Sequence, residues 1–376
     1  MIHKSTMTKT SPSSSLRIIL WVIVGMWFGL LYYLLMSRNK LRMSNVDFLE
    51  GYSVKDQEPD HALLSSSSSP PPPAILTDDT PRGEFVSGTL ANKKQGGALL
   101  SYSGDLSKGY GPIPNRIWMF WDGDVASNRV VSLCIDSWKH YNPTYDLVVL
   151  NKSNYRTYVD VDVGSLRHAG DDITRFSDFL RCLVLSKHGG IWVDASIICH
   201  APVGWVHAIQ TTHQVELVGY YNGSTDTSML HSSPVIENWF FACVPNSKFM
   251  TDWCTEFLRF NEFDTVELYL ADLRGQNVQF VNMMYLEYLT MHASSQCAFQ
   301  HHPDTYRIYL FRCNDGPFKY LDDVGWKGVD AVQRLVDPET SASYHQYTMT
   351  KLCKNERTEL LKRDDAEILR AFSHIT

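Results

Sequence analysis

The stretch of residues 171–196 constrains the fold of this chain more than any other part of the sequence. Its apolar side chains recur at helical spacing, which predicts one buried stripe along a helix. These side chains are Ile173, Phe176, Leu180, Leu183 and Val184. Asp178 and Arg181 lie three residues apart on the opposite side. The stretch therefore begins with a predicted amphipathic helix that has one apolar and one charged face.

A short buried strand is predicted to follow this helix. Gly189 and Gly190 supply the left-handed backbone that commonly ends a helix. Residues 191–193 form an apolar run of strand length, and the run stops at the carboxylate of Asp194. Ligands of open α/β sheets bind at the carboxyl ends of the strands. We therefore expect Asp194 and the charged face of the helix to converge on one polar ligand.

The composition is that of an ordinary globular protein and argues against several functional classes. Of the 376 residues, 44% are hydrophobic and 20% are charged, so the chain can bury a sizeable core. The net charge of −7, with lysine and arginine scattered along the chain, provides no basic patch for nucleic acid. No CxxC, HExxH, EF-hand or GxSxG motif occurs, which argues against zinc sites and serine hydrolases.

An apolar run without a charge spans residues 18–36. As a helix it reaches roughly 28 Å, which nearly crosses the hydrocarbon core of a bilayer. A cleavable signal peptide is the alternative, but the run exceeds the usual apolar region of about 7 to 15 residues. We therefore expect residues 1–17 to form a short cytoplasmic tail and residues 18–36 to form a transmembrane anchor.

The side of the membrane that carries the folded domain is not decided by charge, because basic residues flank the run equally on both sides. Glycosylation sequons at Asn151 and Asn222, together with eight cysteines beyond the run, favour a lumenal domain. This predicts a single-pass type II protein of the Golgi or another secretory membrane. The cysteines allow 105 complete pairings, among which the sequence does not choose. The alternative is a bacterial-type enzyme that faces the cytoplasm.

Residues 37–111 are polar and contain a serine run followed at once by a proline run, which predicts a disordered stem. From about residue 112, short apolar runs alternate with helical stretches, as in α/β units, so residues 112–376 are predicted to fold as one domain. The expected strands are 116–121, 145–150, 191–193 and 216–221, and the expected helices are 130–141, 174–187, 249–260, 278–291 and 359–372.

Two motifs resemble a known family. SDFLR followed by GGIWVDAS, within residues 177–196, is similar to the signature of the capsular polysaccharide synthesis and glycosyltransferase family 32 proteins, relatives of the DxD-type sugar transferases. Upstream, IPNRIWMFWDGD at residues 113–124 is similar to the first strand of those enzymes. The resemblance is good over about residues 113–205 and loose beyond. It implies an α/β domain of GT-A type, a Rossmann-like fold that binds nucleotide sugars.

The resemblance also implies roles for three of these residues. Trp121 stands where the family has a tryptophan that stacks on the nucleobase, and the alternative is a core tryptophan, since the chain has ten. Asp178 and Arg181 match residues that contact the donor sugar, and a guanidinium can also approach a phosphate oxygen. The alternative for this pair is a solvated ion pair worth a few tenths of a kcal/mol.

Asp194 matches the first acid of the DxD motif, but Ser196 stands where that motif has its second acid. Mn²⁺ and Mg²⁺ favour hard oxygen ligands, and a neutral hydroxyl binds them more weakly than a carboxylate. Three outcomes are open: Asp194 holds the metal with later oxygen ligands, a cationic side chain replaces the metal, or activity is lost. The resemblance favours the first, with Asp194 and Ser196 as candidate metal ligands. Among later polar residues, Tyr344, His345 and Lys351 can close over a pyrophosphate, although no motif singles them out.

The resemblance implies a glycosyltransferase that moves a hexose from a nucleotide-diphosphate sugar to a glycan, glycoprotein or polysaccharide acceptor. It further implies retention of anomeric configuration and assistance by Mn²⁺ or Mg²⁺. Asp194, Asp178 and Arg181 are the candidate catalytic residues and, with Trp121, the candidate nucleotide-sugar-binding residues. The alternative is a degenerate protein of the same fold that binds a sugar or nucleotide without catalysis. Donor, acceptor and linkage leave no readable motif.

Overall fold

The computed structural model describes residues 85–90, 93–101, 110–170, 172–222, 234–281, 283, 285–302 and 305–373. The predicted cytoplasmic tail, the anchor at residues 18–36 and the serine–proline tract lie outside these residues. Within them, no helix combines the length and the apolar character that crossing a bilayer requires. The eight cysteines all belong to the described part, and no disulfide bond joins any two of them.

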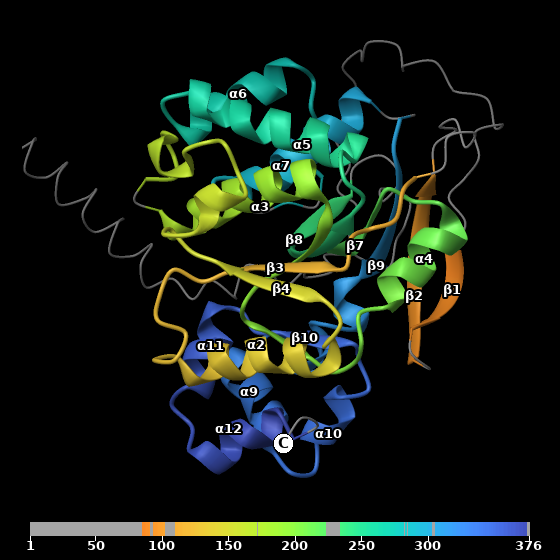
Figure 1. The fold of residues 1–376 in the computed structure, drawn as a ribbon, viewed down its shortest axis with the longest axis vertical. Helices are drawn as coiled ribbons and strands as arrows, with labels where there is room; N and C mark the ends of the chain where they lie inside the picture. Colours follow the sequence, from red (N-terminus) through yellow and green to blue (C-terminus); the bar gives the residue numbers. More distant parts are fainter. Residues whose placement is uncertain are drawn as a thin grey trace, which may run out of the picture. The chain divides into compact units, whose positions relative to one another are not determined.

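A mixed eight-stranded sheet lies at the centre of the described part, in the order β1-β2-β9-β7-β8-β5-β3-β4 (Figure 1). The strands are β1 Phe85–Leu90, β2 Lys93–Ser101, β3 Arg116–Phe120, β4 Asp146–Leu150, β5 Gly190–Val193, β7 Leu217–Asn222, β8 Val235–Cys243 and β9 Arg307–Arg312. Strand β3 pairs in parallel with both β4 and β5, whereas β8 is antiparallel to β5 and β7. The carboxyl ends of β3, β4 and β5 therefore share one edge of the sheet.

Helices cover both faces of this sheet (Figure 1). One face carries α3 Ile173–His188, α5 Lys248–Arg259, α6 Val266–Gly275 and α7 Thr290–His301. The other carries α2 Arg129–Tyr141, α4 Trp205–His213, α8 Lys319–Asp322, α9 Gly328–Val336, α10 Ser341–Tyr344, α11 Lys354–Leu360 and α12 Asp365–Ala371. The described residues also form four 3₁₀ turns: η2 Tyr155–Thr157, η3 Val163–Ser165, η4 Phe260–Glu262 and η5 Cys313–Asp315.

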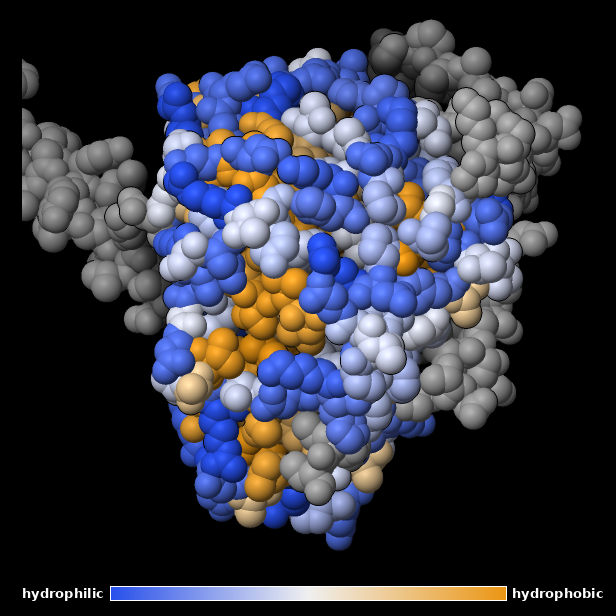
Figure 2. All heavy atoms as spheres, in the orientation of Figure 1, coloured by the Kyte–Doolittle hydropathy of each residue, from blue (hydrophilic) through white to orange (hydrophobic). Residues whose placement is uncertain are grey.

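The two hydrophobic cores follow from the alternation of side chains along the strands. In β3, Ile117 and Met119 belong to the core on the α2 face, and Trp118 and Phe120 belong to the core on the α3 face. Strand β4 is an edge strand whose middle side chains are only partly buried. Figure 2, in the orientation of Figure 1, shows hydrophobic surface over the region of β3 and β4. Strand β3 therefore packs into a core on each face of the sheet.

The predicted elements of the first half are confirmed, with ends that move by a residue or two. Strands β1 and β2, however, lie inside the range 37–111 that was predicted to be a disordered stem. Strand β2 pairs antiparallel with β9, so the sheet begins before the predicted domain start at residue 112. The composition argument missed these strands because backbone pairing at a sheet edge needs no apolar pattern.

The helix predicted at residues 278–291 is wrong. Asn277 and Tyr285 have positive φ angles of 64° and 58°, which interrupt a right-handed helix. Instead, the side chain of Gln296 in α7 accepts a hydrogen bond from the Val281 amide at 3.0 Å and donates one to the Val281 carbonyl at 2.9 Å. An amide side chain that satisfies both backbone groups of one residue holds this segment in a non-helical conformation.

The single helix predicted at residues 359–372 is also wrong, because two helices occupy this region. Helix α11 ends at Leu360 and α12 begins at Asp365. Asp364 accepts a hydrogen bond from the Glu367 amide at 2.8 Å, and the Glu367 side chain accepts one from the Asp364 amide at 3.3 Å. This capping box starts a new helix inside the apolar pattern.

A short second sheet lies beyond the end of β5. It consists of β6 Ile197–Cys199 and β10 Met349–Lys351, paired antiparallel with Lys351 opposite Ile197. This pairing brings the C-terminal part of the chain against the turn that contains Asp194 and Ser196.

Candidate functional site

Helix α3 carries Asp178 and Arg181 into the protein interior. It begins after the N-cap residue Asp172, whose carboxylate accepts hydrogen bonds from two backbone amides of the first turn at 2.8 and 3.3 Å. Asp178 is only 3% exposed and Arg181 only 4% exposed, so the alternative of a solvated ion pair is wrong. Ile173, which the sequence placed in the buried stripe, is 43% exposed. The helix is enclosed on its charged side as well, because β8 and α7 supply polar partners there.

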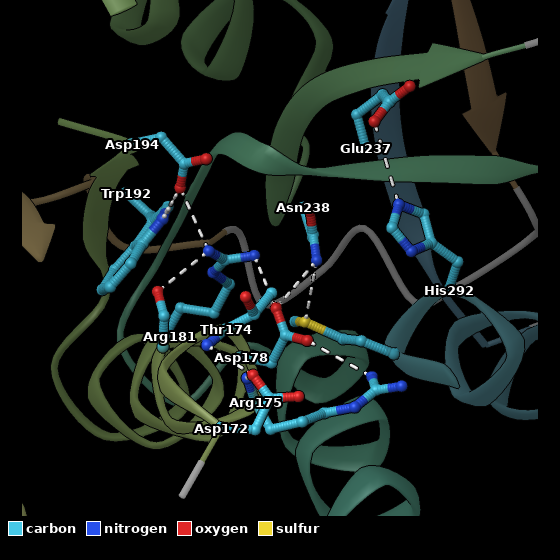
Figure 3. Close-up of polar contacts among 12 residues, drawn as sticks. Asp172, Thr174, Arg175, Asp178, Arg181, Trp192, Asp194, Glu237, Asn238 and His292 are labelled. Carbon is cyan, nitrogen blue, oxygen red and sulfur yellow. Dashed lines mark hydrogen bonds and ion pairs between the residues drawn. The ribbon is translucent and has the colours of Figure 1, made fainter. Parts of the chain in front are cut away.

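Arg181 joins helix α3 to the end of strand β5 (Figure 3). Its Nη1 donates to Asp178 Oδ1 at 2.9 Å, and its Nη2 donates to Asp194 Oδ1 at 3.0 Å. Its Nη2 also donates to Ser177 Oγ at 3.0 Å. The indole Nε1 of Trp192 donates to the same Asp194 oxygen at 3.1 Å. The predicted meeting of Asp178, Arg181 and Asp194 is therefore confirmed, while their chemical roles stay predictions.

Asp178 is enclosed by protein groups from three elements. Its Oδ1 also accepts from Asn238 Nδ2 of β8 at 3.1 Å, and its Oδ2 lies 3.4 Å from Arg175 Nη1. Arg175 in turn donates to Thr290 Oγ1 of α7 at 2.8 Å. Burial raises the pKa of the Asp178 carboxyl, and the guanidiniums of Arg181 and Arg175 oppose that rise. Both oxygens of the Asp178 carboxylate therefore contact protein groups, and Arg181 links this carboxylate to Asp194.

Asp194 follows β5 and presents its carboxylate at the carboxyl edge of the sheet. Its amide donates to the Trp239 carbonyl at 2.9 Å, and its carbonyl accepts from the Ile197 amide at 3.1 Å. Its side chain is 24% exposed, so solvent reaches this carboxylate. Burial on its own would raise the pKa of Asp194, but the ammonium of Lys351 and the guanidinium of Arg181 outweigh burial and hold that pKa below its ordinary value. The carboxylate is therefore ionised at neutral pH.

Lys351 completes the cluster from the C-terminal part of the chain. Its Nζ lies 2.8 Å from Asp194 Oδ2 and 3.0 Å from Ser196 Oγ. The sequence analysis named Lys351 only as one of three late polar residues. Lys351 lies 157 positions after Asp194, and its strand of three residues is too short to show a periodic pattern. The other two late residues contact side chains outside this cluster: Tyr344 donates to Asp323, and His345 packs against His200.

The side chains around Asp194 do not fit a divalent cation. Within the described ranges, no group of three or more His, Cys, Asp or Glu side chains could hold a metal ion. The two proposed ligands, Asp194 and Ser196, both already contact the ammonium of Lys351. A second cation at the same oxygens would lie next to this positive charge, which opposes its binding. The binding of Mn²⁺ or Mg²⁺ at this site stays a prediction.

Trp121 lies just past the end of β3, on the same edge of the sheet as Asp194. The parallel register pairs Trp118 with Trp192, which places Trp121 one row beyond Asp194. The guanidinium carbon of Arg357 lies 5.3 Å from the centre of the Trp121 ring. The indole Nε1 is buried and has no hydrogen-bond partner among the described residues. Trp121 is thus close in register to Asp194, but its indole Nε1 makes no hydrogen bond to the residues around Asp194.

One comparison with known proteins, the family match, agrees with the resemblance found in the sequence. Residues 93–272 match the sequence model of the family described as "Capsular polysaccharide synthesis protein". No curated protein matches the chain. The solved structure of the PaToxG glycosyltransferase is similar with a TM-score of 0.36 and 16% identity, over 72% of this chain and 89% of that one. The structure of the galactosyltransferase LgtC with donor and acceptor sugar analogues is similar with a TM-score of 0.32 and 8% identity, over 69% and 95%.

The family match includes both motifs on which the resemblance rests, IPNRIWMFWDGD at residues 113–124 and SDFLR followed by GGIWVDAS within residues 177–196, and it ends before Lys351. Residues 93–272 of this chain are therefore similar to the capsular polysaccharide synthesis protein family.

Proposed function

We propose that this protein is a glycosyltransferase of GT-A type that moves a hexose from a nucleotide-diphosphate sugar to a glycan, glycoprotein or polysaccharide acceptor, with retention of anomeric configuration. The observation that carries the proposal is the bridge of Arg181 from Asp178 to Asp194, at the carboxyl edge of parallel strands. The match of residues 93–272 to the capsular polysaccharide synthesis family supports it.

Asp194 is the acid that we propose to contact the donor. Its carboxylate is ionised and partly exposed, so it can accept hydrogen bonds from the hydroxyl groups of ribose or of the donor sugar. Arg181 fixes one oxygen of this carboxylate and thereby its orientation. Asp178 fixes Arg181 in turn, which makes it a positioning residue and revises the direct sugar contact that the resemblance implied.

The proposed reaction breaks the bond between the anomeric carbon of the sugar and an oxygen of the diphosphate. The electron pair of this bond leaves with the phosphate oxygen. The acceptor hydroxyl oxygen forms the new bond to the anomeric carbon, and its proton passes to the departing phosphate. Because negative charge grows on the diphosphate as it leaves, fixed hydrogen-bond donors near Asp194 would lower the barrier.

The full-length chain incubated with UDP-glucose, UDP-galactose, UDP-N-acetylglucosamine and GDP-mannose is expected to release free nucleotide from at least one of them. Asp194→Asn should lower that release by about tenfold or more, because one charge-assisted hydrogen bond contributes about 1.5–3 kcal/mol. The matched control is Asp160→Asn, which removes a surface carboxylate paired with Lys187 and should leave the rate unchanged. Tight nucleotide-sugar binding without release in the wild-type protein would instead favour the degenerate binding protein.

Trp121→Ala is expected to weaken the binding of the donor nucleotide about 5- to 150-fold, because stacking of one base on an aromatic ring contributes about 1–3 kcal/mol. Trp121→Phe keeps an aromatic face and should bind within a few-fold of the wild type. Calorimetric titration with UDP and GDP measures both variants. Unchanged nucleotide binding in Trp121→Ala would assign this side chain to the core.

We further propose that residues 18–36 anchor the protein as a single-pass type II membrane protein of the Golgi or another secretory membrane, with the folded domain in the lumen. The support is the uncharged apolar run and the sequons at Asn151 and Asn222. Glycan occupancy at either asparagine in cells, detected by a mass shift on deglycosylation, would exclude a domain that faces the cytoplasm.

A further inference from the structure

The backbone of Lys351 is held rigidly beside the turn that carries Asp194. Strand β10 pairs Lys351 with Ile197 of β6, and the next amide, of Leu352, donates to the Ser196 carbonyl at 3.0 Å. The Lys351 amide donates to the Pro317 carbonyl at 3.0 Å. The Lys351 carbonyl accepts from the hydroxyl of Tyr320 at 2.7 Å. These bonds fix the origin of the side chain, so its ammonium is a preformed part of the site.

The Lys351 ammonium lies between Asp194 and Ser196, the two residues that stand at the acid positions of the DxD motif. Its side chain is 9% exposed, and its Nζ bonds Asp194 and Ser196, the first and third residues of the Asp-Ala-Ser triplet. An ammonium has three donors. Among the described side chains only these two accept from it, so one donor is left for an anion.

The charge of the cluster fits a diphosphate. Among the five groups joined by direct ion pairs, the carboxylates of Asp178 and Asp194 face three cationic groups, those of Arg175, Arg181 and Lys351, which leaves one positive charge in excess among these five. The nearby Glu237 carboxyl is buried and faces His292 at 3.8 Å. Desolvated, hydrogen-bonded cations of this kind bind phosphate oxygens strongly. A net positive cluster at the carboxyl edge of the sheet therefore favours an anion over a further cation.

A second cation extends this positive region toward Trp121. Arg357 lies over the Trp121 ring. Burial raises the pKa of the Cys134 thiol to about 12, and the positive charges of Arg357 and Lys351 oppose this rise. Glu356 is another carboxyl near Lys351. It is fully buried, and burial raises its pKa, which favours its neutral form. Arg357 thus lies at the proposed base site, and Lys351 lies at Asp194.

We propose that the Lys351 ammonium stands in place of a divalent metal ion and binds the diphosphate of the donor, so that nucleotide-sugar binding and cleavage need no metal. This inference rests on the proposed function. As the anomeric carbon–oxygen bond breaks, the electron pair left on the phosphate oxygen is stabilised by hydrogen bonding to the ammonium. Lys351 keeps its proton throughout, so the step balances without a further reactant. Lys351 lies outside the family match at residues 93–272.

The test measures binding of inorganic pyrophosphate, UDP and GDP to the full-length chain by calorimetry, in excess EDTA and in Mn²⁺. We expect the wild-type protein to bind in EDTA and to gain little from Mn²⁺. Lys351→Met should weaken binding about 10- to 100-fold, and Lys351→Arg, which keeps the charge, should weaken it less. The matched control is Lys362→Met, which removes an exposed cation of the same C-terminal region. Thermal unfolding of each variant checks that it is folded.

The outcomes separate this inference from the proposed function. Binding or nucleotide release that is lost in EDTA and restored by Mn²⁺ would overturn the inference and leave the glycosyltransferase in place. This comparison needs only the wild-type protein, so it decides even where Lys351→Met does not fold. Pyrophosphate binding that depends on Lys351, without release from any nucleotide sugar, would support the anion site and count against sugar transfer. Unchanged binding in a folded Lys351→Met variant would overturn the inference.

Discussion

Replacing Arg181 by methionine is expected to lower the free energy of unfolding by about 3–5 kcal/mol, because removing one partner of a buried ion pair leaves the other charge uncompensated. Arg181 bridges two carboxylates, of which Asp178 is 3% exposed. Methionine keeps much of the apolar stem of arginine, so the loss reports the charge rather than a cavity. Denaturant unfolding of the full-length chain, followed by tryptophan fluorescence, measures the change.

The control for this prediction is an exposed ion pair of the same helix. Lys187 pairs with Asp160 at 2.7 Å on the surface, and Lys187→Met should cost less than about 1 kcal/mol. The double variant Asp178→Asn, Arg181→Met removes a stranded charge together with its partner. It should be more stable than Arg181→Met alone by about 1 kcal/mol or more. Equal losses in Arg181→Met and Lys187→Met would show that the bridge is energetically an ordinary surface pair.

The unit from α3 to β5 could be predicted from sequence because its signals are local. The helical stripe, the two glycines and the apolar run at residues 191–193 all lie within one stretch, and each has one dominant structural meaning. The convergence of Asp178, Arg181 and Asp194 followed from the rule that parallel strands present their carboxyl ends at one edge. No long-range pairing had to be guessed.

The burial of Asp178 and the role of Lys351 could not be predicted, because both depend on distant segments. Asn238, which closes over Asp178, lies 60 residues away in a strand that carried no motif. Lys351 reaches Asp194 across 157 positions through a strand too short to show alternation. Hydrophobic periodicity reports which face of an element is buried, but not which polar side chain another element brings to it.

The failed helix at residues 278–291 illustrates a different limit. An apolar pattern there was consistent with a helix, but polar side chains from α7 compete for the backbone. Gln296 bonds both backbone groups of Val281, and this tertiary contact overrides local propensity. The C-terminal region shows a local signal that was overlooked. The capping box of Asp364 and Glu367 marks the start of a helix, but the apolar stripe continues through it and suggested one unbroken helix.

Gly189→Ala is expected to destabilise the protein by about 3 kcal/mol or more, the sum of backbone strain and overpacking. Gly189 has φ +62° and ends α3, and a Cβ atom there would lie 2.5 Å from the backbone nitrogen of Pro245 and 2.8 Å from the carbonyl oxygen of Cys243. Its own carbonyl accepts a hydrogen bond from Trp118 Nε1 at 2.9 Å. Neither backbone neighbour can yield without moving the start of β5, the strand that ends at Asp194.

The matched control is Gly204→Ala, where φ is −55° and no atom lies within 4 Å of the added Cβ, so the free energy of unfolding should change by only about 0.5 kcal/mol. Denaturant midpoints compare the two variants. If β5 shifts in Gly189→Ala, Asp194 moves relative to Arg181 and Lys351, and pyrophosphate binding should fall even in the fraction that remains folded. Equal stability of the two variants would mean that the junction of α3 and β5 is compliant, and the placement of Asp194 would then depend on its side-chain partners alone.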